Sequence, residues 1–202
     1  LARAIGPKLG LALGRNVIID NKPGAGGSLG AGEAAKAEPD GNTLLMGHIG
    51  TLAVNPAIYP RLSYDPLKSF VPVAWVARVP NVLVVPAASP ARNFKEFIEL
   101  ARAKPGRLTF SSGGNGSAAH ITFEYLKLRA RIFMLHIPYR GTSPSINDLI
   151  AGQVDATFTG APAVLTHIKS GRLRALAVSS PQRIPSLPDV PTVAESGFPG
   201  FE

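Results

Sequence analysis

The chain of 202 residues is long enough to bury a core in one large domain or two small ones. It is 45% hydrophobic and 17% charged, which excludes a disordered chain, and its lack of cysteine excludes disulfides, cysteine-based zinc sites and thiol catalysis. The net charge of +8 comes from scattered basic residues without interleaved aromatics. We therefore expect a generally basic surface that attracts small anions, and no nucleic-acid partner.

The first half of the chain alternates short apolar runs with helical patterns. No apolar run approaches the roughly 20 residues of a membrane helix, and the opening residues have the pattern of a helix and not of a signal peptide. Ser28 can cap a helix that Pro39 ends, and the three prolines of 55–66 predict one helical turn with loops. Strands are expected at 16–20, 42–47, 70–78 and 81–86.

The second half alternates strand and helix more clearly. Asn93 caps a helix whose one face carries Phe94, Phe97, Ile98 and Ala101. Further helices are expected from Ser117, over 143–152 with Pro144 in the first turn, and over 162–171. Strands are expected at 107–110, 132–139, 154–160 and 173–180. This alternation predicts an α/β fold with mainly parallel sheets.

The loops beyond the carboxyl ends of parallel strands are where such folds bind ligands. Three polar loops that contain glycine follow expected strands, and we expect them to converge on one cleft. They are "HIGTL" (His48–Leu52), "SSGGNGSAAH" (Ser111–His120) and "TGAPA" (Thr159–Ala163).

The loop Ser111–His120 runs from a strand into the start of a helix. Helix starts carry amides without intrahelical partners and partial positive charge, and glycine lets an anion approach them closely. The candidate groups are the backbone of Gly113, Gly114 and Gly116 and the side chains of Ser112, Asn115 and Ser117. The alternative is that Ser117 only caps the helix and the glycines only turn the chain.

Other chemistry has weaker signals. Residues 114–119 fit the dinucleotide pattern G-x-G-x-x-A, and Arg140 could accept a 2′-phosphate, but no acidic residue stands at the next strand end. Ser117 and His120 lie one helical turn apart, without a carboxylate to orient the histidine for hydrolysis. The four histidines lack metal-ligand spacing, so we expect no metal and no cofactor, and His136 is interpreted as a structural residue.

Several stretches, in order, resemble the Bug family, the periplasmic solute-binding proteins of tripartite tricarboxylate-type transporters. They are "NKPGAGGSLGAGEAAKAEPDGNTLLMG", "NPAIYPRLSYDP", "SSGGNGSAAH", "IPYRGTSPSINDLIAGQVD" and "LRALAVSSPQRIPSLPDVPTVAESGFPGFE". The resemblance covers essentially the whole chain. It implies a fold like that of type II periplasmic binding proteins, with two α/β domains.

The resemblance also implies a function without catalysis. Family members capture small carboxylates, such as di- and tricarboxylates, aromatic acids and acidic amino acids, and pass them to a membrane permease. Ser111–His120 is similar to a carboxylate-binding loop of the family, and its residues Ser112 to Ser117 and His120 are the expected ligand-binding ones. Other cleft residues by this resemblance are His48, Gly50, Thr51, Tyr139, Arg140, Thr159, Gly160 and Ala161.

Compared with the family pattern, the chain is expected to be truncated at both ends. We expect an incomplete first domain at 1–84, a second domain at 85–188 and the start of the return crossing at 189–202. The incomplete domain would expose apolar surface, which another copy could cover as a homo-oligomer or by exchange of elements. A further alternative is an interaction module whose cleft has lost its function.

Overall fold

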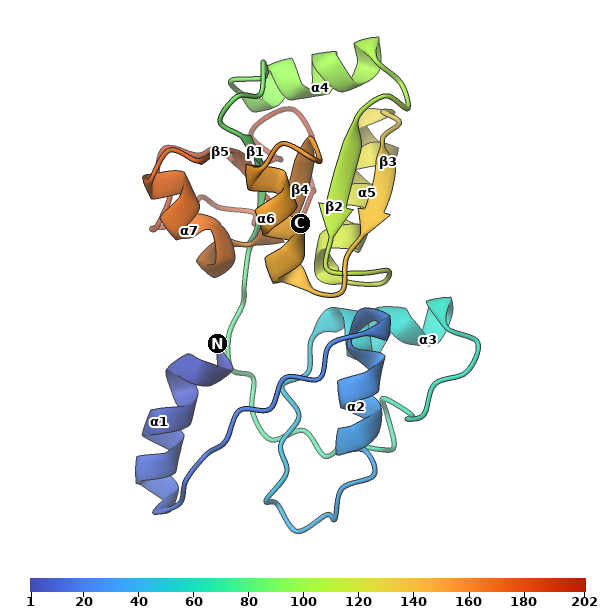
Figure 1. Ribbon diagram of the computed structural model, residues 1–202, viewed down its shortest axis with the longest axis vertical. Coiled ribbons are helices and arrows are strands. Elements are labelled where there is room, and N and C mark those ends of the chain that lie inside the picture. Colours follow the sequence, from blue (N-terminus) through green and yellow to red (C-terminus); the bar gives the residue numbers. More distant parts are fainter. The chain divides into compact units, whose positions relative to one another are not determined.

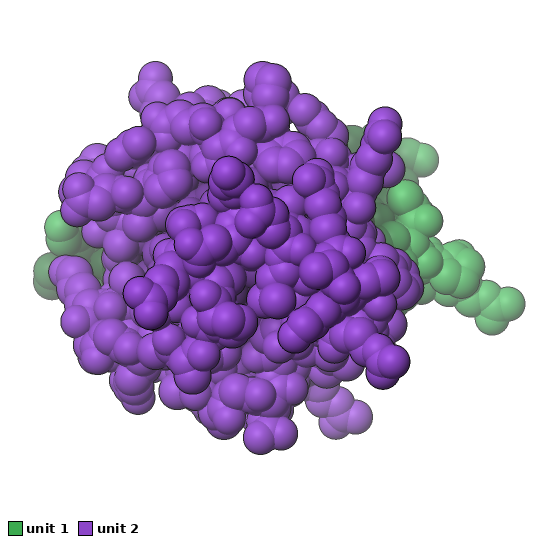
Figure 2. Space-filling model, turned by 90° about the horizontal axis from the view of Figure 1, so that it is seen from above, with its two compact units in different colours: residues 1–70 green, residues 71–202 purple.

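The computed structural model describes residues 1–202, which divide into two units, residues 1–70 and residues 71–202 (Figure 2). The second unit contains both strand β1 (Asn81–Pro86) and the last residues of the chain. The expected domain boundaries after 84 and 188 remain predictions. None of the helices has the length and apolar character needed to cross a bilayer.

The first unit is built from short helices. They are α1 (Ala2–Leu13), a 3-10 turn (Ala25–Gly27), α2 (Ser28–Ala34), a π-helical turn (Gly50–Val54) and α3 (Asn55–Ile58). Asn55 joins two of these segments, because its buried amide donates to the Ser28 hydroxyl at 2.8 Å and to the Gly26 carbonyl at 3.1 Å. The Tyr64 hydroxyl donates to the Thr51 carbonyl at 2.6 Å. These bonds connect α3 to the 3-10 turn and to α2, and they connect the π-helical turn to Tyr64.

Several expectations for the amino-terminal part are wrong. The runs 16–20, 42–47 and 70–78 form no strand, since none of them pairs with another segment and apolar side chains such as Ile18 and Val73 stay exposed. The N-cap of α2 is Gly27, in a left-handed conformation with φ 89°, and Ser28 is the first helical residue. Its hydroxyl accepts from Asn55, so it is used in tertiary packing and not as a cap.

The second unit is organised around a five-stranded sheet in the order β3-β2-β4-β1-β5 (Figure 1). The other strands are β2 (Thr109–Ser112), β3 (Leu135–Pro138), β4 (Ala156–Gly160) and β5 (Leu173–Val178). β2 is parallel to β3 and β4, whereas β1 is antiparallel to both of its neighbours. The sheet is therefore mixed, with β1 opposed to the other four strands, and the amino end of β1 lies at their carboxyl edge.

Helices cover both faces of this sheet, as the period of two in a strand requires. Leu83 and Val85 of β1 face a core shared with α4 (Phe94–Ala103) and α5 (Ala118–Ala130). Val82 and Val84 face the other core, shared with α6 (Thr142–Ile150) and α7 (Ala161–Lys169). Every residue of β1 from 82 to 85 is fully buried, which explains its unbroken apolar sequence.

The start of α4 confirms its sequence signals. The Asn93 side chain accepts from the Glu96 amide at 2.9 Å, and Glu96 accepts from the Arg92 amide at 2.7 Å. Together they form a variant of the capping box in which Glu96 bonds the residue before the N-cap. The expected apolar face of α4 is buried. At the other end of the chain, Phe201 is 1% exposed in the core shared with α4 and α5, so the last residues belong to the packing of this unit.

Candidate functional site

The carboxyl edge of the sheet gathers the starts of three helices. α5, α6 and α7 follow β2, β3 and β4, and these strands run in the same direction. Each start carries partial positive charge and amides without an intrahelical acceptor. Ser117 caps α5 with its side chain, whereas α6 and α7 begin after Gly141 and Gly160 without a side-chain cap. The edge is therefore suited to an anion.

The buried side chain of Ser112 binds the backbone of the glycine loop 113–117. Its hydroxyl accepts from the Gly114 amide and donates to the Gly114 carbonyl, each at 3.1 Å, and lies 2.7 Å from Nε2 of His136. Gly114 and Gly116 adopt φ values of 122° and 77°, which only glycine adopts without strain. The Ser112 hydroxyl thus shapes the loop from inside.

A second set of bonds joins the loop to the first turn of α5. Nδ1 of His120 accepts from the Gly116 amide at 3.2 Å, and the Ser117 hydroxyl accepts from the His120 amide at 3.3 Å. Ser117 donates its own amide to the Gly114 carbonyl at 3.1 Å. The loop therefore uses the amides of Gly114, Gly116 and Ser117 internally. The first amides of α5 itself, those of residues 118 and 119, have no acceptor within the helix.

The loop after β3 lies directly against the glycine loop. The Gly141 amide donates to the Gly113 carbonyl at 3.2 Å, and a Cβ added to Gly113 would lie 3.3 Å from the Thr142 nitrogen. The Tyr139 hydroxyl donates to Asp148 at 2.7 Å, and this bond raises the pKa of Tyr139 to about 12. Arg140 is exposed beside Gly141. The starts of α5 and α6 are thus neighbours, and the cationic side chain of Arg140 lies just before the start of α6.

The start of α7 is the third helix start at this edge of the sheet. The Ala161 amide donates to the Pro80 carbonyl at 3.0 Å, and the Thr159 side chain is buried, 5% exposed. Asn81 follows Pro80, and its side-chain amide donates to the Thr122 hydroxyl of α5 at 2.9 Å. The second unit therefore brings together the sequence-predicted residues of three loops: 112–120, Tyr139–Arg140 and 159–161.

The residues of the "HIGTL" segment lie in the first unit. Nδ1 of His48 accepts from the Gly50 amide at 3.0 Å, and the Thr51 hydroxyl donates to the His48 carbonyl at 3.0 Å. Burial lowers the pKa of His48. The expected loop after a strand is wrong, because Gly50 and Thr51 belong to a π-helical turn that leads into α3.

A stacked pair of histidines was missed by sequence reasoning. The rings of His120 and His136 lie 4.1 Å apart at 17°, and Phe110 stacks on His136 at 4.8 Å. Burial, with a smaller contribution from His120, lowers the pKa of His136 to about 4. Sequence reasoning treated His136 as structural, which agrees with its bond to Ser112, but no spacing signal linked it to His120. No cluster of three or more His, Asp and Glu side chains is placed to hold a metal ion.

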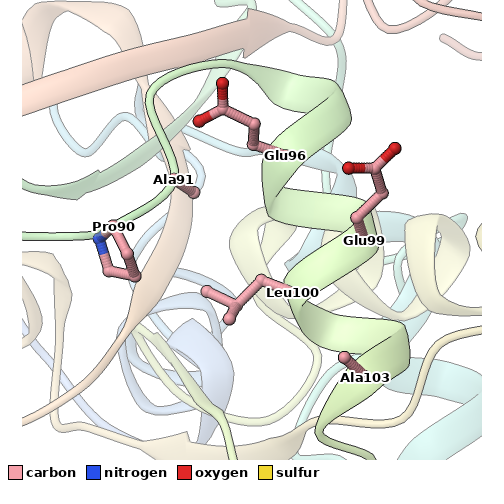
Figure 3. A pocket seen from close by; sticks show the side chains of 6 residues that line it. All are labelled: Pro90, Ala91, Glu96, Glu99, Leu100 and Ala103. Carbon is pink, nitrogen blue, oxygen red and sulfur yellow. The ribbon is translucent and has the colours of Figure 1, made fainter.

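A hollow of about 320 Å³ lies at the opposite edge of the sheet, between α4 and the segment after β1. Figure 3 shows Glu96, Glu99 and Leu100 projecting from α4, with Pro90 and Ala91 across from them. The two carboxylates disfavour an anion here by like-charge repulsion. The glycine-loop edge is therefore the better candidate for an anionic ligand.

Comparison with known proteins places this architecture in one family. Residues 1–202 match the model of the tripartite tricarboxylate transporter family receptor, TctC. A Pseudomonas sp. (strain P51) UPF0065 protein, from the tcbD-tcbE intergenic region, is 43% identical over the whole chain, and BugT of Bordetella pertussis is 40% identical. The chain belongs to this receptor family. It spans 60% and 62% of the length of these two relatives.

Solved structures give the same result for the fold. The chain is similar to R. palustris Rpa4515, solved with adipate, with a TM-score of 0.96 and 36% identity. It is also similar to MatC of Rhodopseudomonas palustris, solved with bound malate, with a TM-score of 0.93 and 33% identity. Each match covers 100% of this chain, and 67% and 68% of those chains. The expected periplasmic-binding-protein fold is therefore confirmed.

Proposed function

We propose that this chain is part of a periplasmic receptor that captures a small organic carboxylate and passes it to a membrane permease without catalysing a reaction. The observation that carries this proposal is the match of all 202 residues to the receptor family. Two solved relatives hold adipate and malate, both dicarboxylates. A di- or tricarboxylate is accordingly the ligand class we assign, with an aromatic acid or an acidic amino acid as the wider range.

The carboxyl edge of the second unit supplies the ligand-binding groups in this proposal. A carboxylate at the start of α5 accepts from the first amides of that helix, beside Asn115 and Ser117. The exposed Arg140 on the neighbouring loop adds a positive charge, and Thr159, Gly160 and Ala161 border the site. Charge-assisted hydrogen bonds of this kind are about twice as strong as neutral ones. His48, Gly50 and Thr51, which lie in the first unit, remain predictions from the family resemblance.

The dinucleotide alternative fits the fold less well. A dinucleotide-binding fold has an open, mostly parallel sheet whose first strand leads into the glycine loop. Here the glycine loop follows β2, and the antiparallel strand β1 separates β4 from β5. The amides of Gly114 and Gly116, the two glycines of the motif, are bonded within the loop. A receptor for a small acid requires neither that strand order nor free amides at Gly114 and Gly116, because the amides of residues 118 and 119 can bind a carboxylate.

Ligand-dependent stability tests the proposal. Malate, adipate and citrate should each be added to the chain, with NADP as the comparison, and the midpoint of thermal unfolding measured. A ligand at about 100 times its Kd stabilises the folded state by roughly 2.7 kcal/mol. We expect a rise with at least one of the acids and none with NADP. A rise with NADP alone would overturn the assignment.

A matched pair of glycine substitutions locates the site. Gly116→Ala and Gly171→Ala place alanine at nearly equal φ values, 77° and 71°, so both carry a similar backbone strain of about 1–2 kcal/mol. Gly171 follows α7, and a Cβ there meets nothing within 4 Å. We expect Gly116→Ala to weaken acid binding at least tenfold more than Gly171→Ala. Equal affinities would remove the glycine loop from the site.

A further inference from the structure

The start of α5 has the geometry of a capping box with an unusual acceptor. In an ordinary box, the N-cap hydroxyl accepts from the third helical amide, and a Glu or Gln at that third position accepts from the backbone amide of the N-cap itself. The box at α5 departs from this pattern in its acceptor and in its donor, which lies one residue earlier. In α5 the N-cap is Ser117 and the third helical residue is His120. Nδ1 of His120 reaches back to the Gly116 amide at 3.2 Å. The returning acceptor is thus an imidazole nitrogen.

The same chain contains a second box of this kind, with a carboxylate as the acceptor, for comparison. In α4 the N-cap is Asn93, the third helical residue is Glu96, and the Glu96 carboxylate accepts from the Arg92 amide at 2.7 Å. Arg92 and Gly116 occupy the same position, one residue before their N-caps. The two boxes differ in the group that accepts, since a carboxylate keeps its charge near neutral pH whereas an imidazole titrates there.

An imidazole accepts a hydrogen bond only at a nitrogen without a proton. The Gly116 bond therefore places the proton of neutral His120 on Nε2, which lies 3.9 Å from Glu124. Protonation of the ring would put a second donor against the Gly116 amide and break the bond. We propose, on the basis of the proposed function, that His120 is a pH-sensitive positioning residue whose neutral ring holds the start of α5 in its carboxylate-binding shape.

The surroundings of His120 favour the neutral ring. Its side chain is 18% exposed, and one face lies 4.1 Å from the ring of His136. Burial is the main cause that lowers the pKa of His120. The charged groups that act on the pair are both on α5: Glu124 raises the pKa of His120, and Lys127, whose ammonium lies 2.7 Å from Glu124, lowers it. His136 faces the pair from β3, and β2 contributes only Phe110 and the neutral Ser112.

A positioning role for His120 predicts a pH dependence opposite to that of simple charge attraction. A cationic histidine beside a carboxylate site would strengthen anion binding as the pH falls. Here a fall in pH protonates His120, opens the box and disturbs the amides at the start of α5, so binding of malate or adipate weakens. The sign of the pH dependence therefore separates a positioning role from direct contact with the ligand.

A titration of the unliganded chain by NMR tests the capping box without any ligand. The shifts of the Gly116 amide, the Arg92 amide and the His120 ring should be followed from about pH 8 to about pH 4, because an unperturbed histidine titrates between about pH 5 and 8 and the pKa of His120 is lowered. We expect Gly116 to move with the midpoint of the His120 ring, and Arg92 to show no change with that midpoint. A Gly116 amide that does not follow the ring, or a neutral ring with its proton on Nδ1, would overturn the proposal.

Two substitutions then connect the box to binding. His120→Gln keeps a returning acceptor that does not titrate, and His120→Phe keeps a flat ring against His136 but has no acceptor. With malate and adipate as probes at about pH 8, we expect His120→Phe to lose roughly three- to tenfold in affinity, the net value of one hydrogen bond, and His120→Gln to lose less than about twofold. Relative to the unmodified chain, both variants should show a weaker dependence of affinity on pH.

Failure of this inference and failure of the proposed function give different results. Equal affinities and equal pH dependence in all three chains would overturn the role of His120. If the unmodified chain binds neither acid but Gly116 still follows the His120 ring, the proposed function fails and the capping box is supported.

Discussion

Replacement of the Phe201 side chain by alanine tests whether residues near 201 are part of the core of the second unit. The ring is 1% exposed, stacks on Tyr125 at 4.8 Å and lies 6.3 Å from Phe158. Removing a buried phenylalanine ring costs about 3–5 kcal/mol. We therefore expect Phe201→Ala to lower the free energy of unfolding by about 3 kcal/mol.

The assay should report on the second unit alone. Hydrogen exchange of the β1 amides does so, since residues 82–85 are fully buried at the centre of that unit. Phe133→Ala is the matched control, because Phe133 is 56% exposed and its loss should cost less than about 1 kcal/mol. Equal exchange rates in the two variants would refute the reasoning and show that the carboxyl-terminal segment contributes little to this core.

The remaining predictions concern a cap, two titrations and one exposed ring. Asn93→Ala should lower the unfolding free energy by about 1 kcal/mol in urea, through loss of the bond to the Glu96 amide. The pKa of His136 is lowered from 6.5 to about 4, so the unfolded chain binds more protons than the folded chain between these two pH values. The free energy of unfolding in urea should therefore fall as the pH drops through this range, and an unfolding free energy that does not change there would contradict the shift. The difference in alkaline absorbance between the chain and Tyr139→Phe should titrate near pH 12, and nearer pH 10 in an Asp148→Asn background. Trp75 is 74% exposed, so its fluorescence should resemble free tryptophan at low concentration and shift to the blue if a second copy covers it; an unshifted spectrum at high concentration would argue against that homo-oligomer.

Local signals in the sequence were read correctly. The caps at Asn93 and Ser117 are formed by groups within three residues of each other, so the sequence alone contains the whole interaction. The burial of one face of α4 follows from apolar spacing along a single helix. The strand 81–86 was predicted with its observed bounds, because a strand that is buried on both faces has a continuous apolar run.

Errors arose where a structure depends on partners distant in the chain. The run 16–20 has the β-branched residues of a strand, but a strand also needs a neighbour, and none pairs with it. Ser28 has the side chain of an N-cap, yet Asn55, 27 residues away, binds its hydroxyl. The stacking of His120 on His136 likewise depends on α5 and β3 packing together, which no spacing rule encodes.

The reversed direction of β1 determines where the polypeptide enters the second unit. Pro80 precedes this strand, and its carbonyl accepts a hydrogen bond from the amide of Ala161, the first residue of α7. A Cβ on Gly160 would lie 2.9 Å from the Val79 side chain. The segment that leads in from residue 71 thus ends within one hydrogen bond of a helix start at the proposed binding edge. A shift of that helix start would therefore change its hydrogen bond to the Pro80 carbonyl. If β1 were parallel to its neighbours, the entry point would lie a full strand length away, and the same shift would have to cross the sheet to reach it.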